Sequence, residues 1–141
     1  AARLPAKQAL PVINANINRD IDFEDPTLPL LWWWAVERHS VEGREEVMKR
    51  FVRPTLWKSR LGHKSLLPRL VRRYAAEGSE AGWNALVRLL RAAPDEAARD
   101  TLWGPVLQGW REMPREPNST ALAARIREHE LAAMILERWR T

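Results

Sequence analysis

Apolar side chains recur along the chain at the three- and four-residue spacing of an α-helix. The clearest series is Leu66, Leu67, Leu70, Val71 and Tyr74, whose members share one helical face. No segment sustains the alternation of apolar and polar residues that is typical of a half-buried strand. The pattern therefore predicts an all-α protein.

Prolines, glycines and short polar side chains divide this pattern into segments of about 10 to 20 residues, the usual length of helices in globular proteins. They predict seven to eight short helices, joined by short loops that favour antiparallel pairs. Thr27, Ser40 and Ser65 are predicted as N-caps, and Gly104 with Pro105 is predicted to end a helix. The helices are expected to begin near residues 5, 27, 40, 65, 79, 94, 106 and 118, with a short helical turn over 54–60.

The helical segments show no exact repeat period, so the sequence does not demonstrate a regular solenoid. A degenerate right-handed array of helix pairs of the HEAT or armadillo kind agrees with the segment lengths, since such units are about 40 residues long and tolerate weak similarity. With 141 residues, 45% of them hydrophobic, the chain is expected to form one domain over 1–141 with its own core. Because the sequence ends inside a helical pattern, we expect a fragment or subunit of a larger assembly.

Three consecutive tryptophans, Trp32, Trp33 and Trp34, mark the most informative segment. Three successive helical residues spread over about 200° and cannot share one face. Such a helix is either covered on both sides or leaves one ring exposed for a partner, and burial is the more common outcome for large rings. Trp33 is the predicted partner-binding candidate here, and Glu37, one turn later, is expected to form a salt bridge with an arginine.

The net charge of +5 is unevenly distributed. Residues 49–73 contain nine lysines and arginines and no aspartate or glutamate. Asp20, Asp22, Glu24 and Asp25 form an acidic cluster that could either neutralise part of this basic block or present a separate negative patch. An aromatic ring among cations can stack on a base while the charges contact phosphates. Nucleic-acid binding is therefore the alternative function. The block supplies the other partner-binding candidates, Trp57, Arg53, Lys58, Arg60, Arg72 and Arg73, which could contact a nucleic acid or clamp an acidic protein surface. Charged outer faces are also ordinary for helices.

Residues typical of catalytic and metal sites are sparse. The chain has no cysteine, which excludes disulfides, thiolate metal sites and a covalently attached c-type haem within it. His39, His63 and His129 lack a partner at a ligand spacing, and no phosphate-binding glycine loop or nucleophile elbow is present. The longest apolar run, residues 28–36, is far shorter than the roughly 20 residues that cross a bilayer. We therefore expect no catalytic residue, no metal, no cofactor and no membrane insertion.

One segment resembles a known family. Residues 25–37 read D-P-T-L-P-L-L-W-W-W-A-V-E, which resembles a segment in the helical region of large secreted planctomycete and verrucomicrobial proteins. These proteins combine a β-propeller of the membrane-bound dehydrogenase type, a HEAT-like region and a c-type cytochrome. Two further segments agree more loosely, L-L-P-R-L-V-R-R-Y-A at 66–75 and L-W-G-P-V-L-Q-G-W at 102–110.

The resemblance implies a HEAT-like connector in an extracytoplasmic, periplasmic redox protein whose partners are the propeller or cytochrome domain. Because this chain lacks the cysteines for haem and any propeller pattern, none of the family's chemistry transfers to its residues. The expected function is a non-catalytic scaffold and docking module, and any dehydrogenase activity would belong to other domains.

Overall fold

The computed structural model describes residues 3–17, 23–114 and 119–140 of the chain. The described residues contain eight α-helices, one 3-10 helix (η1), one π-helical turn (η2) and no strand, as the hydrophobic pattern predicts. In chain order the elements are α1 (Ala6–Ile17), α3 (Leu28–His39), α4 (Arg44–Phe51), η1 (Pro54–Lys58), η2 (Leu61–Leu66), α5 (Leu67–Glu77), α6 (Glu80–Arg91), α7 (Glu96–Glu112), α8 (Ser119–Glu128) and α9 (Glu130–Arg140).

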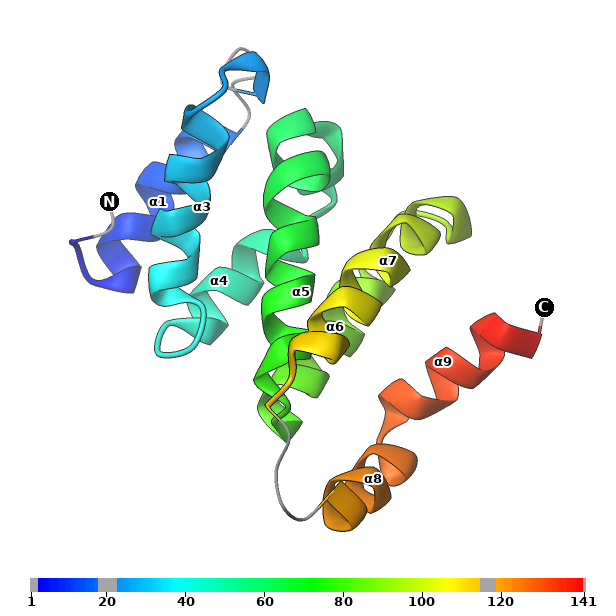
Figure 1. Ribbon diagram of the computed structural model, residues 1–141. Coiled ribbons are helices and arrows are strands. Elements are labelled where there is room, and N and C mark those ends of the chain that lie inside the picture. The colour runs from blue at the N-terminus through cyan, green and yellow to red at the C-terminus, as the bar shows by residue number, and fades with distance from the viewer. Residues whose placement is uncertain (1–2, 18–22, 115–118, 141) are drawn as a thin grey trace.

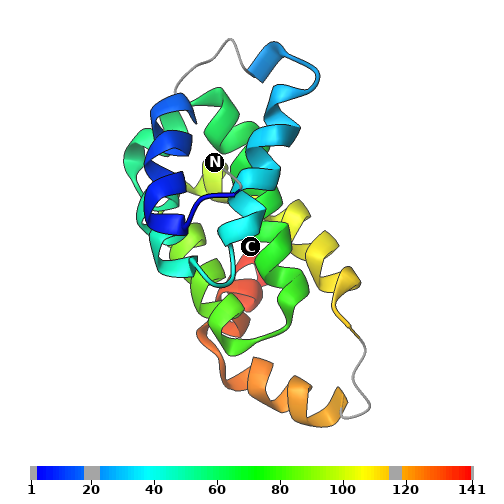
Figure 2. The same cartoon turned by 90° about the vertical axis from the view of Figure 1, so that its left-hand side faces the viewer.

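The helices follow one another across the molecule in nearly the order of the sequence (Figure 1). The first helices, α1, α3 and α4, lie together on one side, α5 occupies the centre, and α6 and α7 lie beyond it. Helices α8 and α9 lie at the opposite end from α1, and α8 projects furthest in both views (Figures 1 and 2). The most extensive contact joins α5 to α7, and α9 contacts α6 as well as α8, so several main contacts join helices that are not adjacent in the sequence.

The core is one continuous apolar cluster centred on α5. Its inward face buries Leu67, Leu70, Val71, Tyr74 and Ala75, which matches the predicted stripe. The cluster reaches α1 on one side and Leu131 of α9 on the other. Among residues 3–17, 23–114 and 119–140, no helix is long and apolar enough to cross a membrane.

Tyr74 joins the centre of the molecule to the first helices. Its hydroxyl donates a 2.8 Å hydrogen bond to the carbonyl oxygen of Ser40, and its ring is fully buried. The Arg44 guanidinium lies 5.2 Å from the ring centroid and forms an ion pair with Glu77 at 2.6 Å. Burial raises the pKa of Tyr74, so the phenol stays protonated as a donor.

Several predicted helix boundaries are confirmed. Gly78 ends α5 in the left-handed conformation, with φ of 66°, which glycine adopts without a Cβ clash. The Ser79 hydroxyl accepts a hydrogen bond from the N–H of Gly82, and the Asp95 carboxylate accepts one from Ala98, so each caps the helix that follows. The proline at 54 ends the preceding helix and begins η1.

Other predicted boundaries are wrong. Ser40 closes α3 instead of opening a helix, because its hydroxyl donates to the carbonyl of Glu37. Ser65 is buried inside η2, which runs directly into α5. The boundary predicted at Thr27 is confirmed, since Thr27 is the N-cap residue of α3, but its side chain makes no capping hydrogen bond. The carboxylate of Asp25 accepts the N–H groups of Thr27 and Leu28 in its place. Local sequence does not distinguish these roles, since the same short polar groups serve both ends of a helix.

Two prolines lie within continuous helices. Pro11 is inside α1, and α7 continues through Gly104 and Pro105, where the sequence predicts a break. The carbonyl that loses its partner at Pro105 belongs to Thr101, which is exposed to water. Gly104 has no Cβ to clash with the proline ring. Packing of Leu102, Val106 and Gly109 against α5 holds both halves of α7 together.

The C-terminal segment is also divided differently from the prediction. Two helices replace the single one expected, and they meet at His129. The Nδ1 atom of His129 accepts the N–H of Leu131 and so caps α9. Residue 118, near which the sequence predicts the start of this segment, lies outside the described residues.

Candidate docking site

An apolar hollow lies between α7 and α9. It has a volume of about 440 Å³ and is continuous with a second hollow of about 200 Å³ that shares Asp100, Trp103 and Arg138. We call the two together the α7–α9 groove. Its lining residues are Glu96, Arg99, Asp100, Trp103, Gly104, Val106, Leu107, Trp110, Met134, Ile135, Glu137, Arg138 and Trp139.

The wall on α7 is an unbroken helical stripe. Trp103, Leu107 and Trp110 follow the i, i+4, i+7 spacing, so the three side chains line one face of the helix. The opposite wall of α9 contributes Ile135 and Trp139. Trp139 is 71% exposed and Leu107 is 43% exposed, values typical of charged side chains rather than of large apolar ones. The groove is therefore an apolar surface that the described residues leave open.

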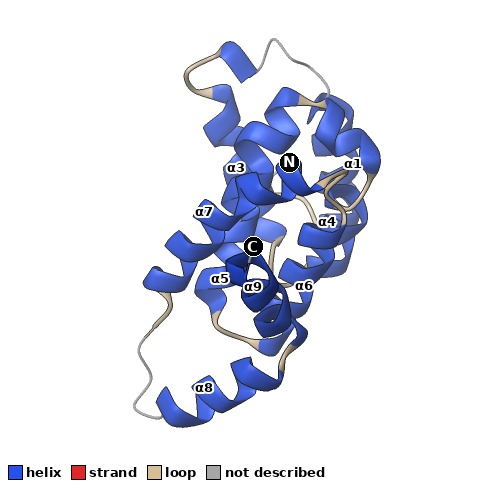
Figure 3. Ribbon diagram, turned by 90° about the vertical axis from the view of Figure 1, so that its right-hand side faces the viewer, coloured by secondary structure: helices blue, strands red, loops and turns tan. Residues whose placement is uncertain are grey.

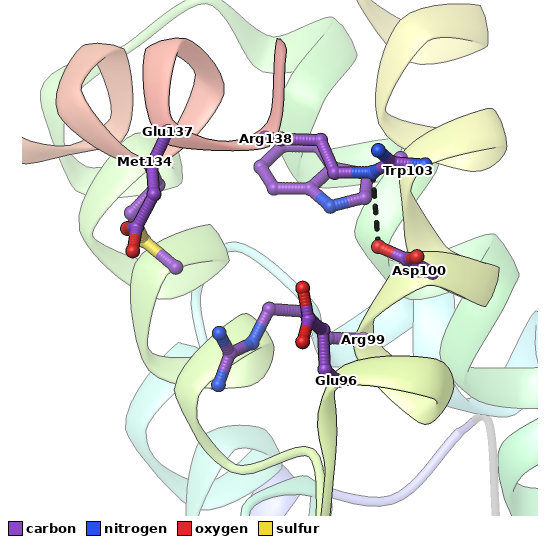
Figure 4. Close-up of a pocket in the computed structure, with 7 residues that line it drawn as sticks. All are labelled: Glu96, Arg99, Asp100, Trp103, Met134, Glu137 and Arg138. Atoms are coloured by element: carbon purple, nitrogen blue, oxygen red, sulfur yellow. Dashed lines mark ion pairs between the residues drawn. The ribbon is translucent and has the colours of Figure 1, made fainter. Parts of the chain in front are cut away.

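Polar side chains cross the groove at its narrower end. Figure 4 shows Arg138 of α9 reaching Asp100 of α7, with 2.9 Å between guanidinium and carboxylate. Glu96 and Arg99 lie on the α7 side of the same hollow and Glu137 on the α9 side. This end therefore combines three carboxylates with two guanidiniums, and no ion pair is recorded for Glu96 or Glu137 within the described part of the chain.

Helix α9 is attached to α6, and this attachment keeps the groove open. The imidazole of His129 packs edge-on against Trp83 of α6, and its Nε2 lies 2.7 Å from the side-chain oxygen of Asn84. An ion pair joins Arg91 of α6 to Glu130 at the start of α9. Because α9 packs mainly on α6 and α8 while α7 packs mainly on α5, the facing sides of α7 and α9 remain apart (Figure 3).

The tryptophan-rich helix α3 is buried on one side only. Trp33, the predicted partner-binding residue, faces the core and is 9% exposed, whereas the adjacent Trp34 is 53% exposed. The exposed ring is therefore one residue later than the candidate that the sequence favours. Glu37 forms the expected salt bridge, at 3.9 Å to the Nε of Arg73, although its side chain is exposed.

Two other predicted residues, Arg72 and Arg73, lie close to this helix. They contribute to a hollow of about 340 Å³ that we call the arginine pocket, lined by Leu30, Trp33, Trp34, Glu37, Arg69, Arg72, Arg73, Ala76 and Glu112. Arg72 makes a bidentate contact with Glu112 of α7, one arm of which measures 3.0 Å. This contact holds the pKa of the Glu112 carboxyl below its usual range.

The remaining candidates of the basic block lie elsewhere. Trp57 is half-buried and stacks on His63, with 5.8 Å between ring centroids, in a hollow separate from the arginine pocket. Arg60 pairs with Glu24 of the acidic cluster at 3.3 Å. Arg53 and Lys58 are exposed. The structure therefore divides the predicted basic block between two surfaces, and Asp20 and Asp22 lie outside the described residues.

The α7–α9 groove was not predicted from the sequence. The predicted break at residues 104–105 separates Trp103 from Leu107 and Trp110, so their common face is not recognised as one stripe. Trp139 is a large apolar residue of the last helical segment and is therefore available for burial, yet the packing of α9 on α6 and α8 leaves it 71% exposed. The sequence pattern that could have indicated the groove is the i, i+4, i+7 spacing of Trp103, Leu107 and Trp110, which continues across the Gly-Pro pair.

Binding of a metal ion needs a cluster of suitable side chains. Among residues 3–17, 23–114 and 119–140, no three histidine or acidic side chains lie close enough together to hold a metal ion. The ring nitrogen Nδ1 of His63 lies 2.7 Å from the carbonyl of Ser59, and His39 is buried.

Comparison of the chain with models of known protein families, with curated proteins and with solved structures found no match.

Proposed function

We propose that this protein is a non-catalytic helical docking module that receives an amphipathic helix of a partner protein in the α7–α9 groove. The observation that carries the proposal is the open stripe of Trp103, Leu107 and Trp110 opposite the exposed ring of Trp139. Monomeric proteins rarely leave such apolar surface uncovered, and tryptophans are enriched at the energetic centres of interfaces.

A helix is the occupant that fits the shape of the groove. From Trp103 to Trp110 the α7 stripe extends about 10 Å along the helix axis, at about 1.5 Å per residue, which matches two turns of a third helix. A helix lying between two others presents apolar residues at i, i+3, i+4 and i+7, and helix-in-groove recognition uses this spacing. The partner helix would therefore add a layer to the molecule beside α7 and α9.

The charges at the narrow end specify the partner further. Glu96 and Glu137 border the groove without a recorded ion pair, whereas Arg138 is already paired with Asp100. A basic residue at one end of the partner helix would meet these carboxylates, and such charge complementarity favours one orientation of binding. The proposed occupant is therefore an amphipathic helix with an apolar centre and a basic end.

The biological setting that we propose follows the resemblance of residues 25–37. In that setting the chain is a HEAT-like module, arranged as a right-handed array, of an extracytoplasmic redox assembly, and its partner is the propeller or cytochrome domain. The nearly sequential order of helices α1 to α9 across the molecule supports this view (Figure 1). Such arrays bury their apolar faces against the next helical unit, which is the kind of contact that the α7–α9 groove offers.

Binding of a designed peptide tests the docking function. The probe is a fluorescein-labelled amphipathic peptide of about four helical turns, with a leucine stripe and a lysine at one end. Fluorescence anisotropy measures its affinity for the protein and for the Trp139→Ala variant. We expect the variant to bind roughly 10- to 100-fold more weakly, since a buried tryptophan anchor contributes on the order of 2 kcal/mol.

Trp34→Ala is the matched control, because it removes another exposed tryptophan that lies outside the groove. It should leave the affinity unchanged. Equal losses in both variants, or no binding of the peptide that exceeds binding of a sequence-scrambled version, would contradict the proposal.

Nucleic-acid binding through residues 49–73 stays a second prediction, favoured by the exposed Arg53 and Lys58 beside the half-buried ring of Trp57. Its test is salt-dependent binding of a generic DNA duplex at low ionic strength. Charge reversal at Arg53, Lys58 and Arg60 should abolish that binding. Absence of binding at low salt would exclude this function.

A further inference from the structure

The arginine pocket joins cationic and aromatic groups from separate helices. Arg69, Arg72 and Arg73 follow the i, i+3, i+4 spacing on α5, so their side chains leave the helix on one face. Leu30 and Trp34 of α3 form the apolar side of the hollow and are 39% and 53% exposed. The pocket therefore offers positive charge beside an open apolar wall.

The carboxylates in the pocket neutralise only part of this charge. Glu112 engages Arg72 through two contacts, and Glu37 lies 3.9 Å from Arg73, at the outer limit of an ion pair. Arg69 has no recorded carboxylate partner within the described residues. Its guanidinium donates to the hydroxyl of Ser65 at 2.5 Å and to the Ser65 carbonyl at 3.2 Å.

These contacts orient Arg69 before any ligand binds. Ser65 is 6% exposed, so the group that holds the guanidinium is fixed in the protein interior. An arginine presents several N–H donors in a planar fork, and the Nη1 bonds to Ser65 leave others available. A ligand carboxylate that entered the pocket could therefore bind the Arg69 guanidinium without first displacing a carboxylate of the protein.

We propose that the arginine pocket binds an acidic peptide segment of a partner protein, with one carboxylate on Arg69, a second on Arg73 and an adjacent apolar side chain against Trp34. Charge complementarity selects the acidic groups, and the exposed wall of Leu30 and Trp34 selects a peptide over a small inorganic anion. Glu37 competes with the peptide carboxylate for Arg73. Its ion pair with Arg73, at 3.9 Å, is the weaker of the two in the pocket, so the peptide can displace it. The site is separate from the α7–α9 groove and goes beyond the function proposed there.

Three variants and one probe test this assignment. The probe is a fluorescein-labelled decapeptide of alternating glutamate and leucine residues, and its affinity is measured by anisotropy at fixed ionic strength. Arg69→Gln should weaken binding about 10-fold or more, because a charge-assisted hydrogen bond is lost. Glu37→Gln should strengthen binding several-fold, because it frees Arg73. Arg127→Gln removes an exposed arginine outside the pocket and should leave the affinity unchanged.

The result with Glu37→Gln distinguishes binding in the arginine pocket from general electrostatic attraction of an acidic peptide to a basic protein. Unchanged affinity in that variant would overturn the assignment of Glu37 as a competitor. Equal weakening by Arg69→Gln and Arg127→Gln would overturn the site itself. Circular dichroism verifies that each variant keeps its helical content. If Arg69→Gln alters the fold, Arg73→Gln serves in its place, with the same expected loss.

Discussion

Replacement of Gly109 by alanine tests the closest helix contact in the protein. Gly109 lies inside α7 at its crossing with α5, the most extensive helix contact of the fold. A Cβ at this position would overlap the carbonyl oxygen of Arg72 and lie 2.8 Å from the Cβ of Ala75. Neither atom can move aside by a side-chain rotation, because the Arg72 oxygen belongs to the backbone of α5 and the Ala75 Cβ is attached directly to it.

Two opposing terms set the magnitude. Helix propensity alone predicts that alanine stabilises the interior of a helix by about 1 kcal/mol relative to glycine. Overpacking costs about 1 to 3 kcal/mol, and the rigid backbone obstacle places this site near the upper value. We therefore expect Gly109→Ala to lower the free energy of unfolding by about 2 kcal/mol, or the melting temperature by roughly 8 °C.

Urea denaturation followed by circular dichroism measures this difference. Gln108→Ala is the control, because it changes an exposed neighbour on the same helix and should be nearly neutral or slightly stabilising. If Gly109→Ala were as stable as the unaltered protein or more stable, then α5 and α7 would not approach as closely as described.

Three further substitutions test other parts of the fold by the same denaturation assay. Tyr74→Phe removes the donor to the buried Ser40 carbonyl and should cost about 1 to 2 kcal/mol; no loss would contradict this link between α5 and the end of α3. Gly78→Ala should cost about 1 to 2 kcal/mol, because the position has φ of 66° and a Cβ there would lie 2.6 Å from the sulfur of Met113; a neutral result would contradict the left-handed ending of α5. Asp25→Asn tests how stability depends on acid. The backbone N–H groups of Leu28 and Thr27 lower the pKa of the Asp25 carboxyl in the folded protein. The ionised carboxylate therefore stabilises the fold fully above the unfolded pKa of about 3.9, and this contribution disappears as the pH falls through the lower folded pKa. The unaltered protein should therefore lose more stability than Asp25→Asn below about pH 4, and parallel pH profiles would contradict the capping role.

The sequence predicted the parts of the fold that depend on local chemistry. Gly78, Ser79 and Asp95 mark helix ends through backbone conformation and side-chain caps, and both effects act within a few residues. The predicted stripe of α5 is buried for the same reason, since its periodicity already requires one apolar face. Local signals therefore identified the class of the fold and most of its helices.

The parts that were missed depend on contacts between distant residues. The break predicted at residues 104–105 is absent because α5 packs against both halves of α7, and this packing outweighs one lost backbone hydrogen bond. Trp34 rather than Trp33 is exposed because the rotation of α3 is set by its neighbours. The periodicity of an all-apolar helix cannot indicate that rotation. Trp139 is exposed because α9 is anchored to α6, far away in the sequence.

The lack of cysteine in the chain allows a direct test of the α7–α9 groove. A single cysteine at Leu107→Cys can carry an environment-sensitive fluorophore inside the groove. Val41→Cys gives a matched label outside it, since Val41 is 45% exposed and Leu107 is 43% exposed.

The decisive measurement is the emission of each label as the amphipathic peptide is added. We predict a saturable blue shift at position 107, because a docked helix removes water from the fluorophore, and no shift at position 41. The same response at both positions, or no shift at 107 when anisotropy shows that the peptide is bound, would contradict docking in the α7–α9 groove.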